Sequence, residues 1–284
     1  MTSRRRRVLW VCVVLSAALA AGLGALMLYE DKLIFFPSPL AAGEWPPAKA
    51  SGFELRDVEL VAEDGQRLHA VYAQATGGAE GRPVLLFCHG NAGNLADRYP
   101  YLPELTRFAD VLLFDYRGYG RNDGQPSEEG LYRDAMAAWS WLTTEAGVAP
   151  SRIVLLGRSL GGGPAAELAT RVPAAGLILD STFTSIPDMA QIAFPFVPRF
   201  LVRTKFDTER KLAQITCPVL VVHSRADEVV PFRMGQALFA AAREPKTWVE
   251  LEGAGHNETL YRGGQRYLSA LEAFSSGCVP APAK

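Results

Sequence analysis

Short, uninterrupted apolar runs alternate with longer segments of helical character along most of the chain. Each run spans only three or four residues, which is typical of strands buried on both faces of a parallel sheet. The apolar runs are 84–87, 111–114, 153–156, 177–179 and 219–222. The main segments of helical character are 131–142, 165–171 and 234–242. This alternation predicts an α/β fold, in which helices connect parallel strands.

The pattern changes on either side of this region. Residues 53–61 and 67–75 alternate apolar and polar positions on the two sides of an Asp-Gly turn, which predicts an antiparallel hairpin. Residues 248–251 supply a last strand and residues 267–274 a closing helix. The sequence therefore predicts a mostly parallel, eight-stranded sheet with flanking helices.

The segment 182–210 interrupts the alternation. It holds three prolines among apolar side chains, which predicts short, broken helices with an apolar face. We expect a small helical lid over the carboxyl ends of the strands, where ligands bind in open α/β sheets. The candidate substrate contacts are Met189, Ile192, Phe194 and Phe196. The alternative is that these side chains only pack the lid onto the body.

The N-terminal part of the chain carries four arginines, at 4–7, before an uncharged stretch at 8–29. About 20 apolar residues suffice to cross a bilayer as a helix, and arginines favour the cytosolic side. We expect residues 1–29 to be a basic tag and single-pass transmembrane signal anchor, with a cytosolic N-terminus and an exported, periplasmic or extracytoplasmic body. The alternative is a cleaved signal peptide, because Ala18-Leu19-Ala20 resembles a cleavage site.

Composition predicts the boundaries of the linker, the domain and the C-terminal tail. Residues 30–52 include a proline-rich stretch, so we expect a membrane-proximal linker there. Residues 53–278 are then the domain, and 49% of the chain is hydrophobic, which is enough for a large core. Residues 279–284 are expected to be a disordered tail.

Charge and cysteine usage exclude several classes of protein. Four of the 29 basic residues lie at 4–7 and no acid precedes Glu30, so the remaining chain has 25 basic and 30 acidic residues, a net charge of −5. This mildly acidic body argues against nucleic acid as a partner. Of the four cysteines, Cys12 lies in the apolar N-terminal stretch and the other three have no paired spacing. Neither a disulfide framework nor a metal site is indicated.

The pentapeptide Gly157-Arg158-Ser159-Leu160-Gly161 directly follows one apolar run and precedes a helical segment. A serine at the apex of such a turn is exposed as a nucleophile, and the sharp turn requires small neighbours. The following helix directs backbone N–H groups and the positive end of its dipole toward an oxyanion formed there. We therefore predict that Ser159 is a catalytic nucleophile.

Asp227 and His256 each follow a later predicted strand. The chain order Ser159, Asp227, His256 is the one expected when three strand-end loops converge over one sheet. Ser159 would attack an acyl carbonyl, His256 would take and return the proton, and Asp227 would orient the imidazole. Glu228 and Asp180 are alternative acids, and the alternative for His256 is a surface loop histidine.

With these residues in view, the chain resembles the α/β-hydrolase superfamily over nearly its whole length. Further motifs that carry the resemblance are Phe35-Phe36-Pro37, His89-Gly90-Asn91 and the segment 115–120. Within the superfamily it is similar to membrane-anchored serine hydrolases related to bud-emergence proteins and to depalmitoylating and lysophospholipid-cleaving hydrolases, which share a serine aminopeptidase-like core. The resemblance implies that the backbone N–H groups of Asn91 and Leu160 form the oxyanion hole. It also implies that His89 holds its loop and is not the base.

The resemblance implies a serine hydrolase that cleaves carboxylic ester or thioester bonds of small-molecule or lipid acyl substrates. This mechanism needs no cofactor, and the sequence has no nucleotide- or metal-binding motif. Two alternatives are a serine peptidase of the aminopeptidase type and a non-catalytic binding protein with the same fold. Arg158 also has two interpretations, as a contact for an anionic substrate or as part of a structural ion pair.

Overall fold

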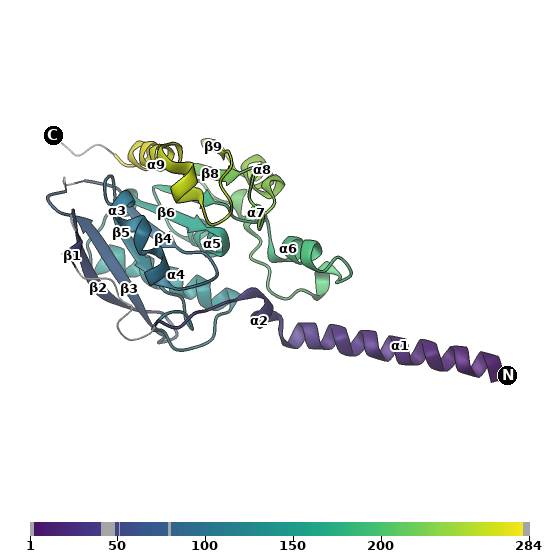
Figure 1. Cartoon of the computed structure of the whole chain (residues 1–284). Helices are drawn as coiled ribbons and strands as arrows, with labels where there is room; N and C mark the ends of the chain where they lie inside the picture. Colours follow the sequence, from purple (N-terminus) through teal and green to yellow (C-terminus); the bar gives the residue numbers. More distant parts are fainter. Residues whose placement is uncertain (1–2, 41–48, 51, 79–80, 281–284) are drawn as a thin grey trace.

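One twisted sheet runs through the protein, and the helices and the candidate site are arranged around it (Figure 1). The computed structural model describes residues 3–40, 49–50, 52–78 and 81–280. Within these residues the sheet has nine strands in the order β1-β2-β3-β5-β4-β6-β7-β8-β9. The strands are β1 (Lys49–Ala50), β2 (Phe53–Val61), β3 (Arg67–Ala75), β4 (Val84–Cys88), β5 (Asp110–Phe114), β6 (Ile153–Arg158), β7 (Gly176–Asp180), β8 (Val219–Ser224) and β9 (Lys246–Leu251).

The pairing confirms the predicted mostly parallel, eight-stranded sheet and adds one short edge strand. All pairs among β4 to β9 are parallel, and β3 joins them by an antiparallel pairing with β5. The predicted hairpin is β2 and β3, which pair from Phe53 opposite Ala75 to Val61 opposite Arg67. The additional strand, β1, is only two residues long, and so short an element leaves no periodic pattern in the sequence.

Helices cover both faces of the sheet, which explains the continuous apolar runs. Along β4, Val84 and Leu86 belong to one buried cluster, whereas Leu85 and Phe87 belong to the other. The first face is covered by α4 (Glu128–Thr144), α5 (Gly162–Arg171), α7 (Thr208–Leu212) and α8 (Phe232–Ala241). The second face is covered by η1 (Leu95–Tyr101), α3 (Leu102–Leu105) and α9 (Thr259–Cys278). A short 3-10 helix, η2 (Pro150–Arg152), precedes β6.

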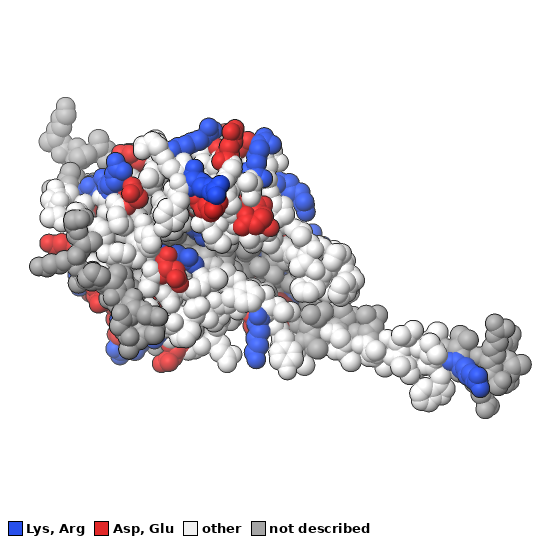
Figure 2. Space-filling model, in the orientation of Figure 1, with Lys and Arg blue, Asp and Glu red and all other residues white. Residues whose placement is uncertain are grey.

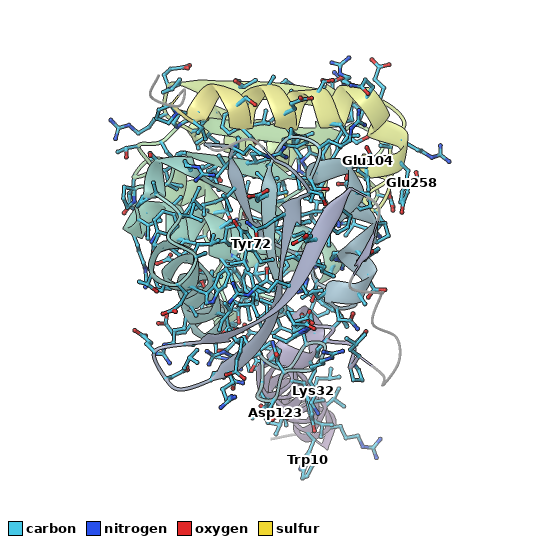
Figure 3. All side chains as sticks on the ribbon, turned by 90° about the vertical axis from the view of Figure 1, so that its left-hand side faces the viewer. Trp10, Lys32, Tyr72, Glu104, Asp123 and Glu258 are labelled. Atoms are coloured by element: carbon cyan, nitrogen blue, oxygen red, sulfur yellow. The ribbon has the colours of Figure 1, made fainter. Side chains whose placement is uncertain are left out.

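The hairpin is anchored to the same core. Tyr72 of β3 lies near the middle of the view in Figure 3, and its ring packs edge-on against Trp141 of α4 with the centroids 5.5 Å apart. On the visible outer face, acidic and basic side chains are interspersed over the domain (Figure 2).

The segment between β7 and α7 forms the broken helices that its prolines predict. It contains α6 (Ile186–Ala193) and the 3-10 helix η4 (Arg199–Leu201). Ser185 begins α6, since its side chain accepts a hydrogen bond from the Asp188 backbone N–H. In Figure 1, α6 projects from the body beside the N-terminal helices.

The N-terminal stretch forms α1 (Ser3–Leu28), which extends away from the body in Figure 1. Over the part of the chain that the structure describes, no helix combines the length and apolar character that a membrane span needs. The transmembrane anchor predicted over residues 1–29 is therefore not supported. Export of the body stays a prediction.

Residues 30–40, which we call the strap, pack closely on the domain. The strap contains α2 (Glu30–Ile34), and the carboxylate of Glu30 accepts hydrogen bonds from the backbone N–H groups of Thr204 (2.7 Å) and Arg203 (3.1 Å). Phe35 is buried against the ring of Phe206. The sequence predicts a linker over 30–52, of which 41–48 and 51 lie outside the described residues, as do residues 281–284 of the predicted tail.

Candidate active site

Ser159 occupies the sharp turn between β6 and α5, at the start of the 3-10 helix η3 (Ser159–Gly161). Its φ of 51° lies in the left-handed region, which is strained for a residue with a side chain and is the mark of a nucleophile turn. A Cβ atom on Gly161 would collide with the backbone carbonyl of Cys88, and one on Gly157 would lie 2.7 Å from the Ala165 Cβ. The two glycines are therefore required by close packing around the turn.

The structure brings Ser159, His256 and Asp227 together at the carboxyl ends of β6, β9 and β8. His256 Nε2 lies 2.9 Å from Ser159 Oγ, and His256 Nδ1 lies 2.8 Å from Asp227 Oδ2. Because a carboxylate only accepts hydrogen bonds, Nδ1 carries the proton and Nε2 is left to accept from the serine hydroxyl. All three residues are buried.

The surroundings of Asp227 favour its ionised form. Burial raises the pKa of this carboxyl, but the hydrogen bonds from His223 and His256 outweigh burial and lower the pKa below the ordinary value. The other carboxylate oxygen accepts the backbone N–H groups of Val229 (2.9 Å) and Val230 (2.8 Å). Asp227 therefore carries a negative charge that faces the imidazole at neutral pH.

The alternative acids lie elsewhere in the same network. Glu228 accepts the backbone N–H of His256 (2.9 Å) and does not bond the imidazole ring. Asp180 lies at the end of β7. Its carboxylate accepts a hydrogen bond from the Tyr267 hydroxyl (3.0 Å) and lies 3.5 Å from the Arg158 Nε. Among these three acids, Asp227 is the one that contacts the ring.

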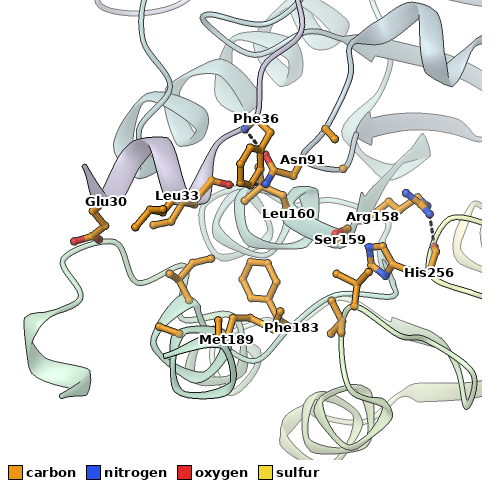
Figure 4. Close-up of a pocket in the computed structure, with 18 of the residues that line it drawn as sticks. Glu30, Leu33, Phe36, Asn91, Arg158, Ser159, Leu160, Phe183, Met189 and His256 are labelled. Atoms are coloured by element: carbon orange, nitrogen blue, oxygen red, sulfur yellow. Dashed lines mark hydrogen bonds between the residues drawn. The ribbon is translucent and has the colours of Figure 1, made fainter. Parts of the chain in front are cut away.

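Arg158 is buried and links the sheet to the loop that carries His256. Besides its contact with Asp180, its guanidinium donates to the backbone carbonyl of His256 (2.5 Å) and to Asn257 Oδ1 (3.4 Å) (Figure 4). This geometry matches the structural ion pair that the sequence allowed.

Asn91 lies in the loop after β4, and Leu160 directly follows Ser159 in η3; both lie on the same side of Ser159 in Figure 4. The carboxamide of Asn91 points to the strap, where Oδ1 accepts the Phe36 backbone N–H (3.0 Å) and Nδ2 donates to the Ile34 carbonyl (2.5 Å). The Tyr119 hydroxyl donates to the same Oδ1 (2.8 Å). The side chain of Asn91 thus holds the loop whose backbone N–H is the candidate oxyanion donor.

His89 is fully buried within this loop. Its Nδ1 lies 2.7 Å from the Gly90 carbonyl and its Nε2 lies 3.3 Å from Asp115 Oδ1. The Tyr116 hydroxyl donates to the His89 carbonyl (2.9 Å). These contacts are those of a residue that holds its loop.

A cavity of about 830 Å³ opens beside Ser159 (Figure 4). Its wall is mostly apolar and combines the strap, the lid segment and the loop after β8. The apolar lining residues include Leu33, Ile34, Phe36, Phe183, Ile186, Met189, Ala190, Ala193, Phe194, Val197, Leu201, Val202, Val229 and Val230. Across the described residues, no group of three His, Cys, Asp or Glu side chains is placed to hold a metal ion.

The predicted substrate contacts divide into two pairs. Met189 and Phe194 line the cavity, whereas Ile192 and Phe196 do not. Ile192 is 43% exposed on α6, and Phe196 is 69% exposed in the turn after the helix. That Ile192 and Phe196 contact substrate stays a prediction, and the described cavity wall favours Met189 and Phe194.

The sequence analysis missed the contribution of the strap to this cavity. Leu33, Ile34 and Phe36 belong to the region predicted as a linker. The one available signal was the motif Phe35-Phe36-Pro37, because two adjacent aromatic residues are unusual in a solvated linker.

The α/β-hydrolase class of protein is defined by a mostly parallel sheet with a serine on a tight strand-to-helix turn. In this class the acid and the histidine follow later strands, as Asp227 and His256 do here. A family model for the alpha/beta hydrolase fold matches residues 83–214. The chain is 38% identical over 276 residues to an uncharacterized protein of Mycobacterium tuberculosis, covering 96% of this chain and 97% of that protein. It is 35% identical over 282 residues to alpha/beta hydrolase domain-containing protein WAV2 of Arabidopsis thaliana, covering 90% and 91%. The chain therefore belongs to the alpha/beta hydrolase family.

The solved structure of an esterase from Pyrococcus furiosus has the same fold. It superimposes with a TM-score of 0.70 at 22% sequence identity, covering 85% of this chain and 98% of that chain.

Proposed function

We propose that this protein is a serine hydrolase that cleaves carboxylic ester or thioester bonds of acyl substrates through an acyl-enzyme intermediate. The observation that carries the proposal is the continuous hydrogen-bond chain from Ser159 Oγ through the His256 ring to Asp227. Membership of the alpha/beta hydrolase family and the likeness in fold to an esterase support the same reading.

The proposed reaction has two steps. Ser159 Oγ attacks the acyl carbonyl carbon while His256 Nε2 takes the hydroxyl proton, and the backbone N–H groups of Asn91 and Leu160 stabilise the oxyanion. As the oxyanion collapses, the bond to the alcohol or thiol breaks and His256 returns the proton to that leaving group. Water then attacks the acyl-serine ester with His256 again as base, which releases a carboxylic acid and the free serine. Asp227 stabilises the imidazolium in both steps.

The apolar cavity supports an acyl chain as the group transferred to Ser159. The side chains of Leu33, Met189 and Phe194 are apolar surfaces against which an acyl chain can pack. Burial of each methylene group of that chain would stabilise the complex by about 0.8 kcal/mol. The motifs Phe35-Phe36-Pro37 and His89-Gly90-Asn91 support a closer assignment to the depalmitoylating and lysophospholipid-cleaving hydrolases.

The test is hydrolysis of p-nitrophenyl esters from acetyl to palmitoyl by the purified full chain. We expect turnover by the wild type, and loss of at least about a thousandfold in kcat for Ser159→Ala. Ser140→Ala is the matched control, because Ser140 is exposed on α4 far from the site in sequence and fold. Equal turnover by wild type and Ser159→Ala would overturn the proposal. Cleavage of aminoacyl amides without cleavage of esters would instead indicate a peptidase.

A further inference from the structure

Four of the side chains that line the cavity carry full charges: Glu30, Asp97, Arg98 and Arg158. Glu30 is bonded to the lid segment, and Asp97 accepts the backbone N–H of Asn94 (2.8 Å). Arg158 is committed to Asp180 and to the loop of His256. The Arg158 Nε makes no hydrogen bond either, but it lies 3.5 Å from the Asp180 carboxylate, so the charge of Arg158 has an ionic partner.

Of the two arginines, Arg98, on η1, is the one without a carboxylate partner among the described residues. Its Nη2 donates to the carbonyl of Ala92, but its Nε is buried and has no hydrogen-bond partner. Within the described residues, no carboxylate lies within 4 Å of this guanidinium. A buried donor left unpaired is costly, and a guanidinium pairs most strongly with a carboxylate or phosphate.

The position of Arg98 relates it to the leaving group of the proposed reaction. It holds Ala92, the residue that follows Asn91 in the candidate oxyanion loop. In Figure 4, Arg158 and His256 lie on one side of Ser159, and the apolar wall at Leu33 and Met189 lies on the other. An acyl chain that fills the apolar side leaves the alcohol or thiol on the side of Arg158, whose positive charge is near that of Arg98.

The electrostatics agree with this placement. Burial lowers the pKa of Arg98, and the nearby positive charge of Arg158 lowers it further. The guanidinium nevertheless stays protonated at neutral pH, because the ordinary pKa of arginine is far above it. Two adjacent positive charges, only one of which has a carboxylate partner, attract an anion.

We propose that Arg98 forms an anion subsite that binds a phosphate or carboxylate on the leaving group of the substrate. The inference rests on the proposed function and narrows it to esters or thioesters whose alcohol or thiol carries a negative charge. Hydrolysis of such an ester consumes one water and releases the fatty acid and the anionic alcohol, so the subsite adds binding and no chemical step.

The test compares lauroyl esters of glycerol, glycerol 3-phosphate and glycolate, which share an acyl chain and differ in the charge of the alcohol. For the wild type we expect kcat/KM to be roughly tenfold to hundredfold higher for an anionic ester than for the neutral one, mainly through KM. The preferred ester identifies phosphate or carboxylate. Arg98→Gln should abolish the preference and Arg98→Lys should retain part of it. Arg107→Gln is the matched control, because Arg107 is exposed and pairs with Glu104 on the surface.

Two results would overturn the subsite: no preference in the wild type, or an equal loss on all three esters in Arg98→Gln, which would indicate a structural role. A second measurement does not depend on catalysis. Calorimetry of Ser159→Ala with glycerol 3-phosphate and with glycolate should show saturable binding of one of them at millimolar concentrations, lost in Ser159→Ala with Arg98→Gln. Binding without any ester turnover by the wild type would keep the subsite and reject the proposed function; turnover without binding would do the reverse.

Discussion

The backbone N–H of Phe36 donates a hydrogen bond to the side-chain oxygen of Asn91, 55 positions further along the chain. The same carboxamide donates to the carbonyl of Ile34. The strap therefore fixes the loop that carries the candidate oxyanion donor. It does so although residues 30–40 contribute no strand to the central sheet. A segment that precedes the first long strand thus lines the candidate active site.

Asn91→Ala should lower kcat by about tenfold while KM changes little. The variant keeps the backbone N–H at position 91 but loses the bonds that aim it, and a misaligned donor stabilises the oxyanion less. Ester kinetics measure the split between kcat and KM. Tyr119→Phe removes one of the three hydrogen bonds and should have a smaller effect; an unchanged kcat in Asn91→Ala would show that the strap does not position the loop.

Asp227→Asn should reduce kcat by about a thousandfold or more, because the neutral amide no longer selects the useful tautomer or stabilises the imidazolium. Glu228→Gln is the control, since Glu228 bonds only the backbone of His256. We expect it to lose less than about tenfold. Single-turnover ester kinetics distinguish the two variants, and equal losses would contradict the assignment of Asp227.

Met189→Trp should shorten the longest acyl chain that the enzyme accepts. Met189 lines the cavity on α6, so a larger ring there removes volume from the apolar wall. Ile192→Trp, on the same helix at a residue that is not among those lining the cavity, is the matched control. A profile of kcat/KM against chain length decides the matter, and a parallel shift in both variants would mean that the cavity does not hold the acyl chain.

The folding free energy should depend on the ionisation of Glu30. Burial raises the pKa of this carboxyl, but hydrogen bonds from Thr204 and Arg203 outweigh burial and lower it below its ordinary value of 4.5. The unfolded chain therefore takes up the proton at a higher pH than the folded one. The stabilisation is complete above pH 4.5 and is lost as the pH falls through the lower folded value.

Thermal unfolding of wild type and Glu30→Gln over this pH range measures that contribution. The difference in melting temperature between them should be largest near neutral pH and should shrink on acidification. Glu59→Gln, at an exposed ion pair with Arg67, should show no such convergence. A constant difference for Glu30→Gln would contradict the linkage.

The fold and the convergence of the candidate catalytic residues could be predicted from the sequence for the same reason. Strands buried on both faces leave continuous apolar runs in the sequence. Ser159, Asp227 and His256 each follow such a run or the last strand, so the order of the strands in the sheet is enough to bring them together. Contacts that depend on tertiary packing were not accessible. Neither the hydrogen bond between Phe36 and Asn91 nor the 43% exposure of Ile192 leaves a local pattern in the sequence.

The central claim is that Ser159 is an activated nucleophile. The most direct measurement is treatment of the purified full chain with a fluorophosphonate, followed by intact mass and peptide mapping. The account predicts one adduct on the peptide that contains Ser159, absent from Ser159→Ala and strongly reduced in His256→Ala. A folded wild-type protein that gains no adduct, or an adduct that persists in Ser159→Ala, would contradict it.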